Sequence, residues 1–242
     1  DGRFLVGDAA ERRGANEPDR VARGFKRRVG DPTPLLLGGA PIAVDRCLAE
    51  MLRWVVTTIG ETEGGPPAAV TVTHPANWGE FKRDVLREAL RLVEIPTPRL
   101  LPEPVAAATW YAQAERLAPG QTVAVYDLGG GTFDAAVLRR RADGRFESLG
   151  RPEGIERLGG IDVDEAVFGH VLRALGPDRA ALDHSANGET PTTAITQLRR
   201  ACVDAKEALS WETSVAIPVW VRGEQREVLL QRAELEELVG PL

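Results

Sequence analysis

Several features that would assign a chain to a specialised class are scarce in these 242 residues. Only two cysteines occur, Cys47 and Cys202, and they lie far apart, which excludes a disulfide framework and indicates a reducing compartment. No apolar run approaches the roughly 20 residues that span a bilayer. A net charge of −6 argues against nucleic acid as a partner. We therefore expect a cytoplasmic globular protein with no membrane segment in this chain.

Lysine is also scarce. The 30 basic residues include only three lysines, Lys26, Lys82 and Lys206, so the other 27 are arginines. This bias makes each lysine a candidate for a specific role. The length exceeds what one small core needs, so we expect one large bilobed domain or two domains.

The spacing of apolar residues predicts a mixed α/β chain. Helices are expected over 42–59, 79–93, 103–117, 162–175 and 190–209, with Thr190 as an N-cap before Pro191, and strands over 68–73, 123–128, 133–138 and 145–150. A hairpin is expected from 213–221 and 226–231, joined by the turn 222–225. Hairpins mixed with crossovers disfavour a simple doubly wound sheet. The first residues read as the middle of a domain and the last helix has no partner, so we expect a fragment.

The most informative stretch is "VAVYDLGGGTFDAAVL", residues 123–138, where three glycines separate two runs that both read as buried strands. Glycine inside a strand loses backbone entropy and offers no side chain to pack. The triplet therefore predicts a turn that a ligand approaches closely. The P-loop pattern is absent from the sequence. A dinucleotide fingerprint would open a helix, whereas 133–138 reads as a strand.

A strand, a glycine turn and a second strand form a hairpin whose tip exposes backbone N–H groups. Such a concave run of amides binds an anion. The missing side chains of Gly129, Gly130 and Gly131 let phosphate oxygens approach, and Thr132 adds a hydroxyl donor.

Two carboxylates flank this turn, Asp127 at the end of the first strand and Asp134 in the second. They cannot bind an anion directly, but they suit a Mg²⁺ ion that phosphates carry and that is held through its waters. The alternative is a hairpin with a flexible tip and two solvated aspartates.

The motif "VYDLGGGTFD" resembles the second phosphate loop of the DnaK-type heat-shock chaperones, the seventy-kilodalton class within the actin-like ATPase superfamily. Further segments resemble that family in the family's order: "DGRFLVGDAA", "GFKRRVGDP", "VTVTHPANWGEFKRDVLREAL", "RLLPEPVAAATWYA", "GIERLGGIDVDEAVF", "ACVDAKEALS" and "LQRAELEELV". The resemblance implies a bilobed actin-like (ribonuclease H-like) fold, with mixed sheets and flanking helices, incomplete at both ends.

The resemblance also implies a division of the chain. Residues 1–67 would belong to the outer subdomain of lobe I and its connecting helix, and 68–118 to the inner subdomain of lobe I. Residues 119–158 would form the inner subdomain of lobe II with the phosphate loop, and 159–230 its outer subdomain. Residues 231–242 would begin the return to the inner subdomain of lobe II.

The function that the resemblance implies is a chaperone ATPase of the stress response. ATP or ADP and Mg²⁺ would be its cofactors, and water would attack the γ-phosphate with no covalent enzyme intermediate. The expected partners are a J-domain co-chaperone, a nucleotide-exchange factor and unfolded polypeptide bound by a region outside this chain.

Catalytic roles carry over to four residues by this resemblance. Lys26 would reach the γ-phosphate and the water, and Glu103 would hold Mg²⁺ waters and signal between lobes. Asp127 and Thr132 keep the loop roles given above, with Asp127 as a metal partner through water. From the residues alone, Lys26 could belong to a solvated basic cluster, and Glu103 could simply favour a helix N-terminus.

Other positions match residues outside the phosphate loop. Pro75 and Arg83 match a pair that relays the nucleotide state, although alone they read as a strand terminator and a surface charge. Arg99 matches an arginine near the surface that meets J-proteins.

Four more matches lie in the second half of the chain. Gly159 and Gly160 match a pair on the phosphate side of lobe II. Lys206 and Ser210, expected on one helix face at i and i+4, match residues that sandwich the adenosine. Alone, they read as a solvent-facing lysine and a serine near a helix C-terminus.

The chain also departs from the family pattern. It lacks the opening Gly-Ile-Asp-Leu-Gly-Thr-Thr type of phosphate loop and the late Gly-Gly-x-x-Arg segment. Val203 stands where a glutamate usually binds the ribose, and Ile161 replaces another acid. We therefore expect the full-length protein to bind Mg-ATP and this chain alone to bind it weakly or not at all.

Two alternatives to a chaperone ATPase stay open. One is a divergent, non-hydrolysing actin-fold scaffold or regulator, which Val203 and Ile161 favour. The other is a different actin-like member, a filament ATPase or a sugar kinase. The segments around Lys26, Pro75 and Glu103 disfavour the latter, because those classes do not share all three.

Overall fold

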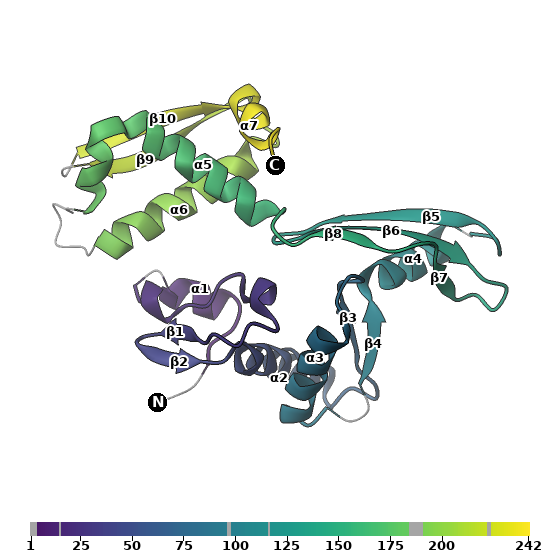
Figure 1. The fold of residues 1–242 in the computed structure, drawn as a ribbon. Helices are drawn as coiled ribbons and strands as arrows, with labels where there is room; N and C mark the ends of the chain where they lie inside the picture. The colour runs from purple at the N-terminus through teal and green to yellow at the C-terminus, as the bar shows by residue number, and fades with distance from the viewer. Residues whose placement is uncertain (1–3, 15, 96–97, 116, 184–190, 222–223) are drawn as a thin grey trace. The chain divides into compact units, whose positions relative to one another are not determined.

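The computed structural model describes residues 4–14, 16–95, 98–115, 117–183, 191–221 and 224–242. The chain folds as two compact units (Figure 1). Unit one comprises Asp1–Val6 and Ala22–Leu158, and unit two comprises Gly7–Val21 and Gly159–Leu242. Each unit is described separately.

The first half of unit one is built around two packed helices and a parallel strand pair. Its elements are η2 (Phe25–Arg28), β1 (Leu35–Leu37), β2 (Ala40–Ile42), α2 (Val44–Glu63), β3 (Thr71–His74), α3 (Glu80–Leu92) and β4 (Arg99–Pro102). Strands β3 and β4 are parallel, and β1 pairs antiparallel with β2. Apolar side chains at helical spacing on α2 and α3 meet in a core that includes Leu48, Leu52, Leu86 and Leu90.

The second half of unit one is a four-stranded sheet with α4 (Glu103–Ala114) packed against it. Its strands are β5 (Thr122–Leu128), β6 (Phe133–Arg140), β7 (Phe146–Ser148) and β8 (Glu153–Ile155). Strand β6 pairs antiparallel with each of the other three. The predicted hairpin is confirmed, because β5 and β6 pair in a register that places Asp127 opposite Asp134.

The expectation that both hairpin strands are buried is wrong for β5. Tyr126 is 75% exposed and Leu128 is 67% exposed. Among the described residues, strand β5 lies at the edge of the sheet, with a neighbouring strand on one side only. On β6, which has neighbours on both sides, Leu138 is fully buried.

Unit two combines three longer helices with a hairpin. Its elements are α1 (Asp8–Gly14), η1 (Pro18–Arg20), α5 (Gly160–Leu175), η3 (Gly176–Asp183), α6 (Pro191–Ala208), β9 (Ser214–Val221), β10 (Glu224–Gln231) and α7 (Arg232–Val239). Strand β9 alternates, with Ile217, Val219 and Val221 buried and the residues between them exposed. The buried side chains meet those of α5 and α6 in one apolar cluster.

Most of the predicted elements are present within a few residues of their expected ends, so the mixed α/β class is confirmed. The short strands β1, β2, β4 and β8 were not predicted, whereas β3 and β7, which are equally short, were. Thr190 and residues 222–223 of the expected turn lie outside the described residues. In the described part of the chain, no helix is long and apolar enough to cross a membrane.

Candidate functional site

The glycine turn at the tip of the β5–β6 hairpin is partly closed on itself. The N–H of Gly129 donates to the carbonyl of Thr132 at 2.9 Å, so this amide serves the turn. The neighbouring Gly130 is open, since a Cβ added there would meet no atom within 4 Å. The expectation that the whole run of amides faces a ligand is therefore too broad, and the open backbone begins at Gly130.

Gly131 is held from outside the hairpin. Its carbonyl accepts a hydrogen bond of 2.7 Å from Nε of Arg27, a residue of the η2 turn. A Cβ at Gly131 would lie 3.0 Å from that Nε, which is closer than packed side chains normally approach. A side chain at the third glycine would therefore require Arg27 to shift.

Lys26, the residue before Arg27, extends to the start of α4. Its Nζ lies 2.9 Å from Oε1 of Glu103, and the two side chains are 53% and 18% exposed. Glu103 is the first residue of α4, where a carboxylate is favoured by the helix dipole. The alternative reading was a solvated lysine and an acid that only favours a helix N-terminus, with no contact between them. Instead, Lys26 and Glu103 form an ion pair although they are 77 residues apart in the sequence.

The two aspartates of the hairpin share one face of the sheet, because they are directly opposite in the β5–β6 register. Asp134 is buried, and this burial raises the pKa of its carboxyl above the usual range. A hydrogen bond with Thr132 opposes the rise, while the charges of Glu103 and Asp127 add to it. Lys26 acts in the opposite sense.

These carboxylates suit a hydrated cation better than a directly bound one. Among the described residues, no three acidic, histidine or cysteine side chains lie close enough to hold a metal ion. Three carboxylates, Glu103, Asp127 and Asp134, nevertheless lie near one another beside Lys26. A Mg²⁺ ion held through its waters by Asp127 and Glu103 fits this donor set.

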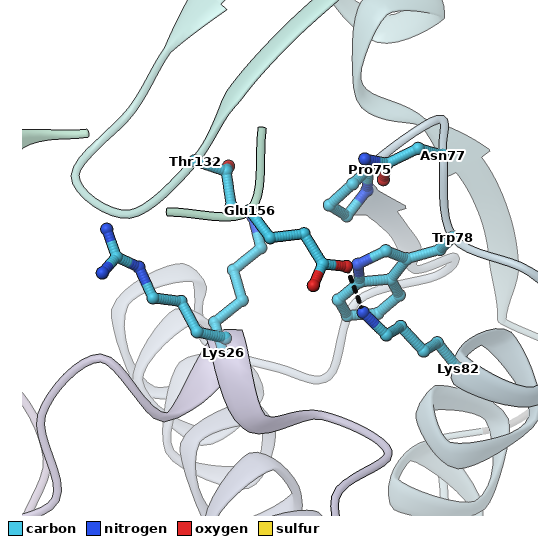
Figure 2. A pocket seen from close by; sticks show the side chains of 8 residues that line it. Lys26, Pro75, Asn77, Trp78, Lys82, Thr132 and Glu156 are labelled. Atoms are coloured by element: carbon cyan, nitrogen blue, oxygen red, sulfur yellow. Dashed lines mark hydrogen bonds and ion pairs between the residues drawn. The ribbon is translucent and has the colours of Figure 1, made fainter. Parts of the chain in front are cut away.

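A pocket opens beside the turn (Figure 2). It is lined by Lys26, Arg27, Pro75, Asn77, Trp78, Lys82, Thr132 and Glu156. Figure 2 shows Glu156 extending toward Lys82, and their charged atoms are 2.5 Å apart. Three predicted site residues, Lys26, Pro75 and Thr132, therefore meet in one place.

Five lining residues were not predicted. They are Arg27, Asn77, Trp78, Lys82 and Glu156. The scarcity of lysine pointed to Lys82, which is one of only three lysines in the chain. The remaining unpredicted lining residues lie within segments that the sequence analysis quoted on account of different residues.

Comparison with known proteins decides the family. Residues 38–242 match the family model described as "Hsp70 protein". The chain belongs to the Hsp70 family. The chain therefore has the actin-like ATPase fold.

Curated Hsp70 relatives agree with this assignment. The chain is 31% identical over 248 residues to "Chaperone protein DnaK" of Elusimicrobium minutum and 29% identical over 248 residues to that of Cenarchaeum symbiosum. Over 195 residues, 80% of the chain, it is 37% identical to a "Chaperone protein HscA homolog" of Acidithiobacillus ferrooxidans. The chain spans 39%, 37% and 29% of the lengths of these relatives.

The residues matched to the relay of the Hsp70 family occupy the β3–α3 connection and α3. The carbonyl of Pro75 accepts the N–H of Trp78 at 3.1 Å, which closes the turn before α3. Arg83 pairs with Glu80 of the same helix at 2.5 Å. Arg99 begins β4, and its N–H donates to the carbonyl of Val70.

The remaining predicted residues of this Hsp70 chain lie in unit two. Gly159 precedes α5, and its carbonyl accepts the N–H of Asp162 and Val163, while Gly160 is the first helical residue. The Nζ of Lys206, on α6, lies 2.6 Å from a carboxylate oxygen of Asp164 on α5. The lysine is therefore already neutralised by a protein partner.

Ser210 does not share a helix face with Lys206, which corrects the expectation. Helix α6 ends at Ala208. The last regular bond runs from the N–H of Leu209 to Ala205, and the N–H of Ser210 bonds Glu207 instead, so the backbone tightens into a turn. Val203 and Ile161 contribute no polar group on α6 or α5.

Proposed function

We propose that this chain is part of the nucleotide-binding domain of a DnaK-type chaperone, which binds Mg-ATP and hydrolyses it by attack of water. One observation carries the proposal. Lys26 and Thr132, the residue that follows the open glycine turn, line one pocket. Phosphoryl transfer needs little covalent chemistry from the protein, so positioned donors and charges of this kind are what it requires.

Lys26 is the residue proposed to contact the transferring phosphate. Its ion pair with Glu103 restrains the ammonium before a ligand arrives. A restrained charge costs less reorganisation at the moment of reaction than a freely moving one. Thr132 lines the same pocket, and its side chain hydrogen-bonds Asp134.

Mg²⁺ would be held by Asp127 and Glu103 through water, and it would neutralise charge on the phosphates. Asp134 provides support for this arrangement. Because burial and neighbouring carboxylates raise its pKa, a cation nearby would favour its ionised form.

The wider function follows the printed names of the relatives, which are chaperones. In this proposal the nucleotide state controls a region outside this chain that binds unfolded polypeptide. A J-domain co-chaperone and a nucleotide-exchange factor would act on the domain, in the cytoplasm during stress. Pro75 and Arg83 would relay the nucleotide state.

A non-hydrolysing scaffold or regulator is the second candidate. Val203 and Ile161 lack the polar groups expected for ribose recognition, and Lys206 is occupied by Asp164. These features weaken adenosine recognition through Lys206 and Ser210 and leave the phosphate side, to which Gly159 and Gly160 are matched, intact.

Single-turnover hydrolysis by the complete gene product that contains this chain separates the two candidates. Lys26→Ala should slow hydrolysis about 100-fold or more, as expected when a charged group at a phosphoryl-transfer site is lost. Arg28→Ala, on the same turn but paired locally with Asp31, is the matched control and should stay within about twofold.

Equal rates for wild type and Lys26→Ala would remove the role given to Lys26. Tight ATP binding without turnover in the wild type would favour the scaffold. The 242-residue chain alone should show little or no heat in an ATP titration, because its sequence contains neither the opening phosphate loop nor the late Gly-Gly-x-x-Arg segment of the family pattern.

A further inference from the structure

We infer that Arg27 is a positioning residue, which fixes the orientation of the Gly131–Thr132 peptide and aligns the phosphate loop with Lys26. The inference rests on the proposed function for its catalytic consequence. Its structural part, the hold on the loop, rests only on contacts within unit one.

The η2 turn is a firm base for such a hold. Gly24, which precedes it, has a left-handed backbone (φ 61°) that starts the turn. Val29, which follows it, is 2% exposed in the core of α2 and α3, and Phe25 packs against the same core. Both ends of the turn are therefore anchored, and the side chains between them extend from a fixed backbone.

Two adjacent side chains leave this turn for two parts of the site. Lys26 reaches Glu103 at the start of α4, and Arg27 reaches the carbonyl of Gly131 at the hairpin tip. Because neighbouring residues in the chain are only about 3.8 Å apart at Cα, the turn sets the distance between the ammonium and the loop. Any shift of the loop relative to Arg27 would also be a shift relative to Lys26.

The hydrogen bond to Gly131 also sets a direction. A peptide unit is planar and trans, so its C=O and the following N–H point in opposite directions. When the carbonyl of Gly131 points to Arg27, the N–H of Thr132 must point away from it. The same bond thus determines where the backbone of Thr132, which lines the pocket, can present its donor.

The three glycines differ in a way that supports this reading. A Cβ would find open space at Gly130, only ordinary contact at Gly129, and a 3.0 Å approach to Arg27 at Gly131. The absence of a side chain at Gly131 lets the arginine side chain lie against the backbone, with Nε, Cγ and Cδ all within 3.8 Å of that position. Gly131 and Arg27 therefore work as a pair.

Two substitutions separate the hydrogen bond from the charge. In Arg27→Gln the side-chain amide nitrogen lies as many bonds from Cα as the arginine Nε, so the donor is kept without the charge. Arg27→Met keeps a stem of similar length and removes the donor. The matched control is Arg28→Met, which removes another arginine–carbonyl contact, the bond to Thr33, from the same turn.

The experiment measures amide hydrogen exchange over residues 129–132 and single-turnover ATP hydrolysis in the complete gene product. Arg27→Met should speed exchange about tenfold and slow hydrolysis about tenfold or more, as expected for loss of a charge-assisted bond. Arg27→Gln should stay within about threefold of wild type, and Arg28→Met within about twofold, in both measurements.

Equal losses in Arg27→Gln and Arg27→Met would show that the charge matters and would overturn the positioning role. Unchanged exchange in Arg27→Met would overturn it as well. If the wild type hydrolyses no ATP, the proposed function fails, and the exchange measurements still decide whether Arg27 orders the loop.

Discussion

The two units use their side chains differently. In unit two, residues from α5, α6 and the β9–β10 hairpin form one apolar cluster in which Val167, Cys202, Ile217 and Leu230 are fully buried. In unit one, the apolar core lies between α2 and α3, while the β5–β8 sheet meets the η2 turn and α3 through polar contacts. The candidate site is formed by hydrogen bonds and ion pairs between segments that are far apart in the sequence, and not by a dense apolar core.

The candidate site is the region of unit one that is held by polar contacts in place of apolar packing. The contacts from Lys26 to Glu103, from Arg27 to Gly131 and from Lys82 to Glu156 are hydrogen-bonded and partly exposed. Contacts of that kind contribute little net stability each. We therefore expect unit two to be sensitive to lost volume and unit one to be sensitive to lost geometry.

Each unit contains a cysteine whose reactivity can be used to follow the unfolding of that unit. Cys47 lies in unit one and Cys202 in unit two, and both are buried. Burial raises the pKa of Cys47, and it raises that of Cys202 to about 12. Both thiols should be inert in the folded protein and react with a thiol reagent only when their own unit opens.

The largest effect is expected from Ile217→Ala in unit two. Ile217 is fully buried, so the change removes apolar contacts and leaves a cavity, lowering the free energy of unfolding by about 3 kcal/mol. Denaturant titration should show Cys202 reacting at a lower concentration while Cys47 stays protected. Leu229→Ala, a 56% exposed position on β10, should cost less than about 1 kcal/mol. If both thiols become reactive together in Ile217→Ala, the units unfold as one and the contrast between them is wrong.

A smaller loss is expected from Gly154→Ala in unit one. Gly154 pairs with Asp134 on β6, and an added Cβ would lie 2.3 Å from Nδ2 of Asn77 and 2.5 Å from Oδ1 of Asp134. Both side chains would have to move, at a cost of about 2 kcal/mol measured by chemical denaturation. Gly65→Ala, where nothing lies within 4 Å, is the control and should be close to neutral. A neutral Gly154→Ala would mean that geometry at this sheet is less demanding than proposed.

The smallest effect is expected from Asp134→Asn, and it should be a gain. The raised pKa of Asp134 means that the folded state holds the proton more strongly, so stability falls as the pH rises from the ordinary carboxyl value through the raised one. Asparagine removes this penalty, so thermal melting at pH 7 should show a higher midpoint in the absence of nucleotide. The gain should be smaller at pH 4 than at pH 7, because the raised pKa makes the wild-type aspartate take up its proton as the pH falls. An equal gain at both pH values would exclude titration of Asp134 as its cause.

The sequence was a good guide where a pattern is local. The run from Asp127 through three glycines to Asp134 predicted a hairpin, and the strands pair as expected. Contacts between distant segments could not be read in this way. Arg27 and Gly131 are 104 residues apart, and no spacing rule connects them. Ser210 shows a second limit of prediction from sequence. The end of a helix depends on a few backbone hydrogen bonds, and its position can differ by one or two residues for the same sequence pattern.

The ion pair between Lys82 and Glu156 has a consequence for how an anion enters the pocket. Three cations, Lys26, Arg27 and Lys82, line it, but two of them are already paired with carboxylates, Lys26 with Glu103 and Lys82 with Glu156. A phosphate that contacts Lys82 must displace Glu156, so binding there is an exchange of one anion for another. The pocket then attracts a phosphate more weakly than its three positive charges suggest. Once the phosphate has displaced it, the carboxylate of Glu156, the residue after β8, no longer forms its ion pair, and the loss of that ion pair marks the exchange.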